Sequence, residues 1–295
     1  MKTIEWPTVL VAAGCYGAWG LATTIFWQWP VLAVVVATLA ITLHSSLQHE
    51  VIHGHPFASR FLSVALVFPA LGLVIPYGRF RDLHLAHHQD ERLTDPYDDP
   101  ETAYLDPRVW ARLPGILRAI LNVNNTLLGR IIIGPFISQY AFMRADWQAI
   151  RRGDRGVLID WLLHVPAVAL VLIWLSMAAM PFWAYALAAY MGNGILRIRT
   201  FLEHRAHERA RARSVVIEDR GPLAFLFLNN NFHAVHHAHP QVPWYDLPGR
   251  YFAARDRHLE RNDGYVYRSY AAIFRRFTFR RKEPVAHPLY RADET

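Results

Sequence analysis

Two long stretches without a charged residue constrain the fold of this chain more than any other feature. No Asp, Glu, Lys or Arg occurs in the 44 residues between Glu5 and Glu50, and none occurs in the 36 residues from Trp161 to Leu196. A transmembrane helix needs about 20 apolar residues, so each stretch is long enough for two spans and a tight turn. Pairs of buried core helices in a soluble protein are the alternative, but two stretches of this length in one soluble domain would be unusual.

Each stretch contains a sequence that favours a turn. Gln28-Trp29-Pro30 divides the first stretch, and Ala179-Met180-Pro181 divides the second. Neither turn carries a charge, whereas arginines cluster just outside the stretches and in the tail after Arg250. This asymmetry is the pattern of the positive-inside rule, and it predicts cytoplasmic termini and cytoplasmic charged loops. The same distribution favours a membrane protein over a nucleic-acid-binding protein as the explanation of the net charge of +7.

We therefore predict an all-α integral membrane protein that forms a single domain over residues 1–295. Four transmembrane helices in two hairpins are expected at about residues 7–27, 31–52, 158–178 and 182–198. A cytoplasmic, histidine-rich cap, accompanied by interfacial helices, is expected at residues 79–155 and 199–295.

Two further apolar segments, 61–78 and 116–142, are predicted to lie at the membrane interface. Only 30 residues separate His53 from His84, and a helix of that length is about 45 Å long. Two crossings of a core ~30 Å thick do not fit into that length, and one crossing would put the two histidines on opposite sides of the membrane. The same parity argument predicts an interfacial amphipathic segment at 116–142.

Eight of the 16 histidines lie in three clusters beside the apolar stretches. The first cluster reads H-E-V-I-H, and the second and third both read H-x-x-H-H. On a helix, positions i, i+3 and i+4 share one face, so the imidazoles of each cluster can converge. Imidazole suits iron, copper, zinc and nickel, and eight imidazoles are too many for one ion. The pattern predicts two metal ions bound by His49, His53, His84, His87, His88, His233, His236 and His237.

The remaining histidines have other predicted roles. His44 lies about 140° from His49 around a helix and is left out of the ligand set. His164 is expected to form a hydrogen bond within its apolar stretch. We expect surface positions for His207, His239, His258 and His287. His55 and His239 are close enough to the clusters in sequence to hydrogen-bond the metal-binding imidazoles instead. The acids that could orient metal-bound imidazoles are Glu50, Asp82, Asp90, Glu91, Asp95, Asp98, Asp99, Glu203 and Asp246.

The three clusters resemble the histidine boxes of the membrane fatty acid desaturase superfamily, which includes bacterial hydrocarbon hydroxylases and carotenoid oxygenases. Its boxes are H-x3–4-H, H-x2–3-HH and H-x2–3-HH, and all three occur here in order, within a resemblance that covers roughly residues 7–250. The stretches Leu93–Glu101 and Asn229–Phe232 resemble the hydrocarbon-oxygenase branch. Glu203-His204 resembles the Glu-His pair of alkane hydroxylases, which implies His204 as a ninth ligand.

The resemblance implies two iron ions, O2 as co-substrate and an external electron donor of the ferredoxin or cytochrome type. The single cysteine, Cys15, cannot by itself hold an iron–sulfur cluster, and the chain has no G-x-G-x-x-G dinucleotide fingerprint. The Arg-rich tail from Arg250 to Arg291 would bind either an acidic face of the donor or anionic lipid headgroups.

The substrate is expected to be apolar, because the site opens next to membrane helices. The leading candidate reaction is the desaturation of a fatty acyl chain. Hydroxylation of a hydrocarbon or terpenoid by the same site is the alternative. Five aromatic residues are candidates to line its path, although such side chains more often serve in ordinary packing: Phe26, Trp27, Tyr190, Phe201 and Phe232.

Two other functions compete with this interpretation. The first box also matches the H-E-x-x-H motif of zinc metalloproteases, with Glu50 as the general base. A protease, however, needs only one further ligand and leaves the two H-x-x-H-H clusters unexplained. A non-catalytic metal carrier would place polar residues along a path inside the spans, whereas these clusters lie at the ends of the predicted spans.

The predicted topology is tested by a reporter fused after Thr295. We expect it to report a cytoplasmic location, because the arginines cluster on the side of the termini. A fusion within the turn at residues 179–181 is the control and should report the opposite side. A periplasmic reporter after Thr295 would contradict the predicted orientation.

Overall fold

The computed structural model of the protein describes residues 4–290, with the side chain of Asp90 left aside, and this part of the chain is mostly helical. The chain divides into two compact units. The first comprises the chain up to Asp82, residues 135–196 and residues 226–228, and the second comprises residues 83–134, 197–225 and the chain from Asn229 onward.

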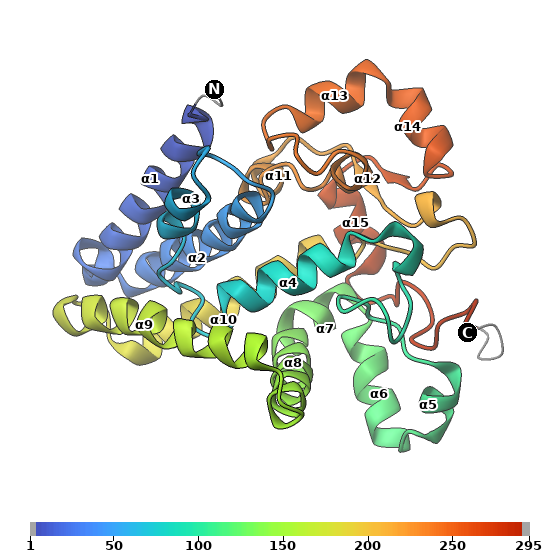
Figure 1. Ribbon diagram of the computed structural model, residues 1–295, viewed down its shortest axis with the longest axis horizontal. Helices are drawn as coiled ribbons and strands as arrows, with labels where there is room; N and C mark the ends of the chain where they lie inside the picture. Colours follow the sequence, from blue (N-terminus) through green and yellow to red (C-terminus); the bar gives the residue numbers. More distant parts are fainter. Residues whose placement is uncertain (1–3, 291–295) are drawn as a thin grey trace. The chain divides into compact units, whose positions relative to one another are not determined.

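The first unit is built on four long helices at the positions of the predicted spans. They are α1 (Trp6–Thr23), α2 (Pro30–Ile52), α9 (Arg155–Met177) and α10 (Phe182–Thr200), whose last residues belong to the second unit. The short helix η1 (Ile25–Gln28) leads into the predicted turn at Gln28-Trp29-Pro30, and α1 and α2 lie side by side (Figure 1). The chain leaves α2 through Gly54, whose φ of +94° is a conformation that glycine adopts without strain.

Two of these helices, α2 and α9, are long and apolar enough to cross a membrane. Only part of α9 is buried within the protein, and many of its large apolar side chains are exposed, Val165 by 65% and Met177 by 74%. Such a surface is unfavourable in water and favourable in lipid. This exposure argues against the alternative of buried core helices in a soluble protein.

The two segments predicted to lie at the interface are not continuous helices. In the first, α3 (Arg60–Leu66) is followed by an irregular stretch over residues 67–76, and the chain then enters α4 (Tyr77–His87). The second is divided among α6 (Gly115–Asn124), α7 (Leu127–Ile132) and α8 (Gly134–Arg151). A helix of six to ten residues is about 9–15 Å long, so α3, α6 and α7 are each too short to span the bilayer.

The second unit combines short helices with a small sheet. Its strands β1 (Val216–Ile217) and β2 (Val266–Tyr267) are parallel, so the prediction of a purely α-helical protein holds for the architecture but not for this detail. The remaining helical elements are η2 (Asp90–Arg92), α5 (Pro107–Arg112), η3 (Ala210–Ala212), α11 (Pro222–Leu226), α12 (His233–Ala238), α13 (Leu247–Ala253), α14 (Arg255–Arg261) and α15 (Tyr270–Phe277).

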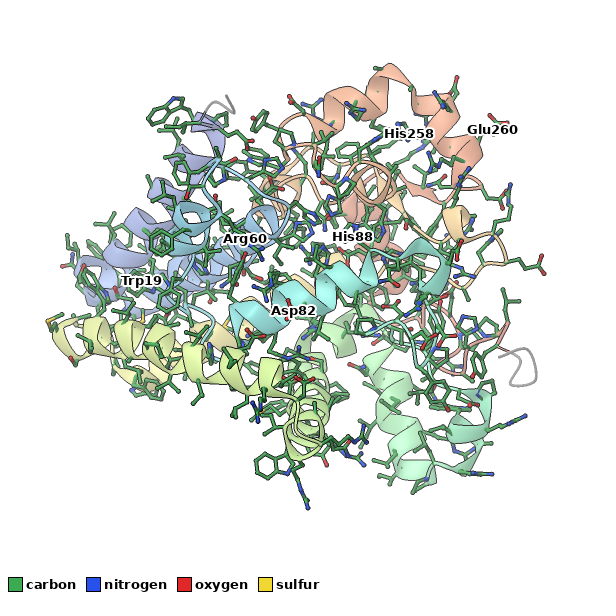
Figure 2. All side chains as sticks on the ribbon, viewed as in Figure 1. Trp19, Arg60, Asp82, His88, His258 and Glu260 are labelled. Carbon is green, nitrogen blue, oxygen red and sulfur yellow. The ribbon has the colours of Figure 1, made fainter. Side chains whose placement is uncertain are left out.

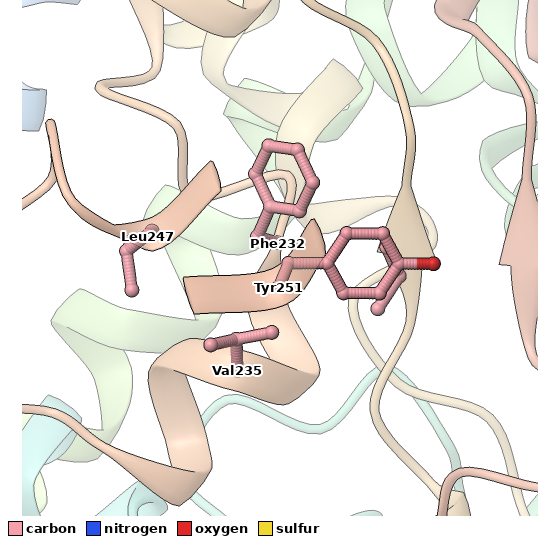
Figure 3. Close-up of a cluster of buried hydrophobic side chains, with 5 residues drawn as sticks. Phe232, Val235, Leu247 and Tyr251 are labelled. Carbon is pink, nitrogen blue, oxygen red and sulfur yellow. The ribbon is translucent and has the colours of Figure 1, made fainter. Parts of the chain in front are cut away.

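A cluster of buried apolar side chains holds α12 against β1 and α13. Figure 3 shows the rings of Phe232 and Tyr251 with Val235 and Leu247, and Val216 of β1 completes the cluster. Phe232 and Val235 are completely buried. Because Val235 faces this cluster, the histidines of α12 can point away from it.

A salt bridge joins three helices of the first unit. Asp146 of α8 accepts two hydrogen bonds from the Arg79 guanidinium, at 2.9 and 3.0 Å, and a third from Trp161 Nε1 at 2.9 Å. Both charged side chains are largely buried. The aspartate therefore ties α4, α8 and α9 together.

We expect Asp146→Ala to lower the free energy of unfolding by about 3 kcal/mol, because the variant leaves a mostly buried guanidinium without its counter-charge. Thermal unfolding of the purified protein in detergent measures the loss. Asp256→Ala, at an exposed aspartate of α14, is the control and should leave the midpoint unchanged. Equal midpoints for Asp146→Ala and wild type would contradict this role.

Candidate metal centre

The second histidine box sits at the carboxyl end of α4, where helical spacing brings its three imidazoles together. His84 and His87 lie within the last turn, and the amide of His88 extends that turn by donating to the carbonyl of His84 at 3.1 Å. Figure 2 labels His88 directly after the helix. His84 Nε2 and His88 Nε2 are 2.9 Å apart, so these two rings converge on one point.

The third box occupies α12, and an asparagine-rich turn sets its position. Asn229 adopts a φ of +54°, which asparagine tolerates better than most residues. Asn231 donates to the backbone carbonyls of Ile217 and Asp219, and Asn230 Oδ1 lies 3.3 Å from His233 Nδ1. The turn therefore fixes both the start of α12 and the orientation of its first imidazole.

His204 lies outside the boxes, in the loop after α10, and several contacts hold it. Its Nδ1 lies 3.2 Å from Ser214 Oγ, and its carbonyl accepts a hydrogen bond from the ammonium of Lys282. Its Nε2 lies 2.8 Å from His87 Nε2 and 3.0 Å from His233 Nε2. The loop histidine thus connects the second and third boxes.

Seven of the nine predicted ligands form two groups within the second unit. In each group the possible ligand atoms lie within 4.8 Å of one another. One group contains His87, His204, His233 and His237. The other contains His84, His88 and His236, with His236 Nε2 at 3.2 Å from His88 Nε2.

The donor atoms of these groups fit metal ions. Two imidazole nitrogens about 2.1 Å from one ion, at a right angle, would be about 3 Å apart. The Nε2 pairs above are separated by 2.8–3.2 Å. Nitrogen lone pairs that face each other at this distance repel unless a proton or a metal ion lies between them, and a metal ion would form a favourable bond with each imidazole of the group.

Acceptors behind the rings set the tautomer that metal binding requires. His87 Nδ1 lies 2.7 Å from Asp99 Oδ1, and His84 Nδ1 lies 3.1 Å from Glu101 Oε1. Because a carboxylate accepts the proton on Nδ1, the lone pair resides on Nε2, which points into the group. The Asp99 carboxylate is itself held by the amides of Thr94 and Glu101.

The electrostatics of the site favour positive charge among the imidazoles. Burial by itself lowers the pKa of His87, but the carboxylates of Glu101 and Asp99 outweigh it and raise that pKa to about 9. Glu101 has a lowered pKa because His87 and His84 overcome the effect of its burial. Burial and the neighbouring imidazoles hold the pKa of His204 and His233 well below the usual value. The acids beside the second box therefore attract a positive charge, whereas His204 and His233 resist protonation.

The first box belongs to the first unit. His49 lies in the last turn of α2, and His53 follows directly after that helix. Their ring centroids are 5.0 Å apart, as expected for positions i and i+4 on one helix. Glu50 between them is buried.

A small cleft opens beside His237 in the second unit. About 20 Å³ of it is accessible to water, which is room for roughly one molecule. Its rim carries His258 and Arg261 of α14 together with Arg211 of η3. Burial and nearby cationic groups lower the pKa of His258, a half-buried side chain at the edge of this cleft.

The structure corrects several predictions for other residues. His287, expected on the surface, is buried, with its Nε2 3.2 Å from Thr94 Oγ1. Phe232, a candidate for the substrate path, belongs to the core cluster behind α12. Phe201 packs on Phe277, so its role is also packing.

Other predicted roles can be compared directly with the contacts. His164 Nε2 lies 2.8 Å from the carbonyl of Leu73, which confirms a hydrogen-bonded histidine. His55 is paired with the Glu5 carboxylate at 2.7 Å. Among the predicted acids, Asp99 contacts His87, and Glu203 lies 3.7 Å from His233. Asp82 pairs with Arg81 instead, and the side chain of Asp90 lies outside the described part of the chain.

Sequence reasoning missed three supporting residues: Glu101, Ser214 and Asn230. Glu101 closes the acidic stretch after the second box, and Asn230 precedes His233 by one helical turn, so position in the chain gave a signal for both. Ser214 has no such signal, because it reaches His204 through an antiparallel bridge between distant residues of a loop.

Comparison with known proteins agrees with this arrangement. Among curated proteins, none matches the chain. A family profile described as "Fatty acid desaturase" matches residues 25–272, which is more than four-fifths of the sequence and includes all three histidine boxes. The protein therefore belongs to the fatty acid desaturase family.

Proposed function

We propose that this protein is a di-iron membrane oxidoreductase that uses O2 and external electrons to desaturate a fatty acyl chain. Membership in the family implies an oxidoreductase with a lipid substrate in a membrane context. The observation that carries the proposal further is the convergence of imidazole Nε2 atoms in two groups, backed by Asp99 and Glu101.

We assign all nine histidines to two iron ions. His87, His204, His233 and His237 would hold one ion. His84, His88 and His236 would hold part of the other, and the order of the boxes in the family supports His49 and His53 as its remaining ligands. An all-nitrogen set without bridging carboxylates distinguishes this site from the Glu-x-x-His sites of soluble di-iron bundles.

When bound, the iron pair would supply O2 activation and the removal of hydrogen from an unactivated carbon. Overall, O2, two electrons and two protons convert –CH2–CH2– into –CH=CH– and two water molecules. The residues of the chain hold the imidazoles in place: Asp99 and Glu101 keep the protons on Nδ1, and Lys282 fixes the loop of His204. Rigid support of this kind preserves the geometry of a metal site during turnover.

The proposed membrane arrangement follows the sequence prediction. Four spans, α1, α2, α9 and α10, would leave both termini and a cap with all boxes in the cytoplasm. The chain would receive electrons there from a ferredoxin or cytochrome type donor with an acidic face.

Hydroxylation of a hydrocarbon or terpenoid is the second candidate, favoured by the likeness of Leu93–Glu101 and Asn229–Phe232 to hydrocarbon oxygenases. Mass spectrometry of lipids from cells that express the protein with a reductase separates the two. Loss of two hydrogens indicates desaturation, and gain of one oxygen indicates hydroxylation.

We expect His204→Ala to abolish turnover and to lower the iron content of the purified, folded protein to one ion per chain or less, because His204 bridges two boxes. Iron is measured by elemental analysis. His207→Ala, a neighbouring histidine that faces Asp263, is the control and should retain two ions and activity.

Two results would count against the assignment. A His204→Ala protein with two irons and full activity would remove His204 from the ligand set. A wild-type protein with a single zinc ion would overturn the di-iron proposal and favour the protease interpretation of His49, Glu50 and His53.

Asp99→Ala should lower metal affinity or activity by about 10- to 100-fold, because the variant removes the acceptor that orients His87. Iron retention during titration with a chelator gives the measurement. Asp98→Ala removes an exposed carboxylate one position earlier and is the matched control. Identical iron retention in the two variants would show that Asp99 has no such role.

A further inference from the structure

A cavity inside the first unit combines apolar walls with polar side chains. About 40 Å³ of it is accessible to water, and it lies between α2, the irregular stretch 67–76 and α10. Ile41, Leu73, Ile75 and Leu196 contribute apolar surface. Four polar side chains also line it, namely His44, Ser45, Gln48 and Asn193.

The irregular stretch that forms one wall is held by side chains of the surrounding helices. The hydroxyl of Tyr185 donates to the carbonyl of Leu71 at 2.8 Å, and His164 Nε2 donates to that of Leu73 at 2.8 Å. Non-helical backbone among membrane helices is tolerated where it is buried in protein or lines a cavity. This stretch satisfies both conditions, which indicates a built wall rather than a packing defect.

The tautomer of His44 follows from its neighbours. The Tyr16 hydroxyl donates its only proton to the carbonyl of Leu66 at 2.7 Å. His44 Nε2, 3.2 Å from the same hydroxyl oxygen, must therefore be the donor in that contact. A neutral imidazole with its proton on Nε2 has an acceptor at Nδ1. His44 thus brings a hydrogen-bond acceptor to the cavity.

The side-chain amides of Gln48 and Asn193 also provide hydrogen-bond acceptors to the cavity. Gln48 Nε2 donates to the carbonyl of Val67 at 3.4 Å, and Asn193 Nδ2 donates to that of Ala189 at 3.1 Å. Both bonds use the amide nitrogens, so the amide oxygens of Gln48 and Asn193 remain as acceptors. Within residues 4–290, no group donates a hydrogen bond to either amide oxygen or to Ser45 Oγ. Polar groups in an apolar, membrane-embedded region are costly and mark binding sites.

We propose that this cavity binds a hydrogen-bond donor, namely a hydroxyl group carried by the hydrocarbon substrate. Three acceptors, from His44, Gln48 and Asn193, would receive such a donor, and the apolar wall would cover the adjoining methylene groups. The identity of the bound molecule as the substrate rests on the proposed function. The binding of a hydroxylated chain does not, because it depends only on the cavity.

The position of the cavity would also set which carbon is oxidised. Ser45 precedes His49 by four residues of α2, a distance of about 6 Å along the helix axis. A hydroxyl held beside Ser45 would therefore place carbons only a few bonds away near the first box. This geometry predicts oxidation at a fixed, short distance from the hydroxyl.

The test compares binding of 1-dodecanol and n-dodecane to the purified protein in detergent, without reductant. Thermal unfolding at a series of ligand concentrations gives the two affinities. We expect the wild type to bind the alcohol on the order of tenfold more tightly than the alkane, as one or two net hydrogen bonds allow. Gln48→Leu and Asn193→Leu should each reduce this preference, because each removes one of the three acceptors.

The matched control is Gln148→Leu, which makes the same change at an exposed position of α8. It should retain the preference for the alcohol. Asn193→Leu should not lower the unfolding midpoint without ligand, because leucine suits an apolar, lipid-surrounded interior. Gln48→Leu also removes the hydrogen bond to the carbonyl of Val67, so a small loss of stability is expected of that variant alone. Equal affinities of the wild type for alcohol and alkane would overturn the proposal, as would loss of the preference in Gln148→Leu.

The outcome separates this inference from the proposed function. Binding is measured without turnover, so a chain that holds two irons and oxidises lipids but does not distinguish the alcohol from the alkane refutes the inference alone. A chain with a single zinc that still prefers the alcohol refutes the proposed function and leaves the binding site in place.

Discussion

The close approach of imidazole nitrogens is the interaction on which the rest of this structure depends. Four Nε2 pairs lie 2.8–3.2 Å apart among buried and half-buried side chains, a geometry that is repulsive unless a proton or a metal ion lies between the nitrogens. Side chains behind the imidazole rings hold the rings in this arrangement. Asp99 and Glu101 hold two rings by their Nδ1 atoms, and Asn230 orients a third. The apolar cluster behind α12 fixes the helix that carries the third box.

A second constraint is the cost of polar groups in an apolar environment. The unit with α2 and α9 contains an irregular stretch, and side chains of the surrounding helices, Tyr185 and His164 among them, satisfy its carbonyls. The same cost applies to the polar side chains that line the cavity beside α2. Leucine would suit this apolar environment better at Asn193, and at Gln48 it would cost only the long hydrogen bond to the carbonyl of Val67. Their acceptors therefore point to a ligand.

Much of the site was predictable because it depends on local periodicity. Spacings of three and four residues put His84, His87 and His88 on one helical face, and the same holds for α12. The helices of the two charge-free stretches were predictable because apolar composition is also a property of neighbouring residues. The prediction of a surface position for His287 was wrong because burial depends on which distant segment covers a residue, and nothing in its neighbours along the chain reveals its partner Thr94. The packing of Phe232 on Tyr251 agrees with the expectation that such aromatic residues more often serve in packing.

The sequence by itself determined the helical class, the positions of the apolar helices and the spacing of each histidine box, because these are properties of neighbouring residues. Only the tertiary structure decided which histidines share a group, since His87 and His204 are 117 residues apart in the chain. It also decided the supporting contacts of Glu101 and Ser214 and the cavity beside α2. The physical reason is that these features arise from packing between distant segments, where burial and hydrogen-bond direction are set by the fold as a whole.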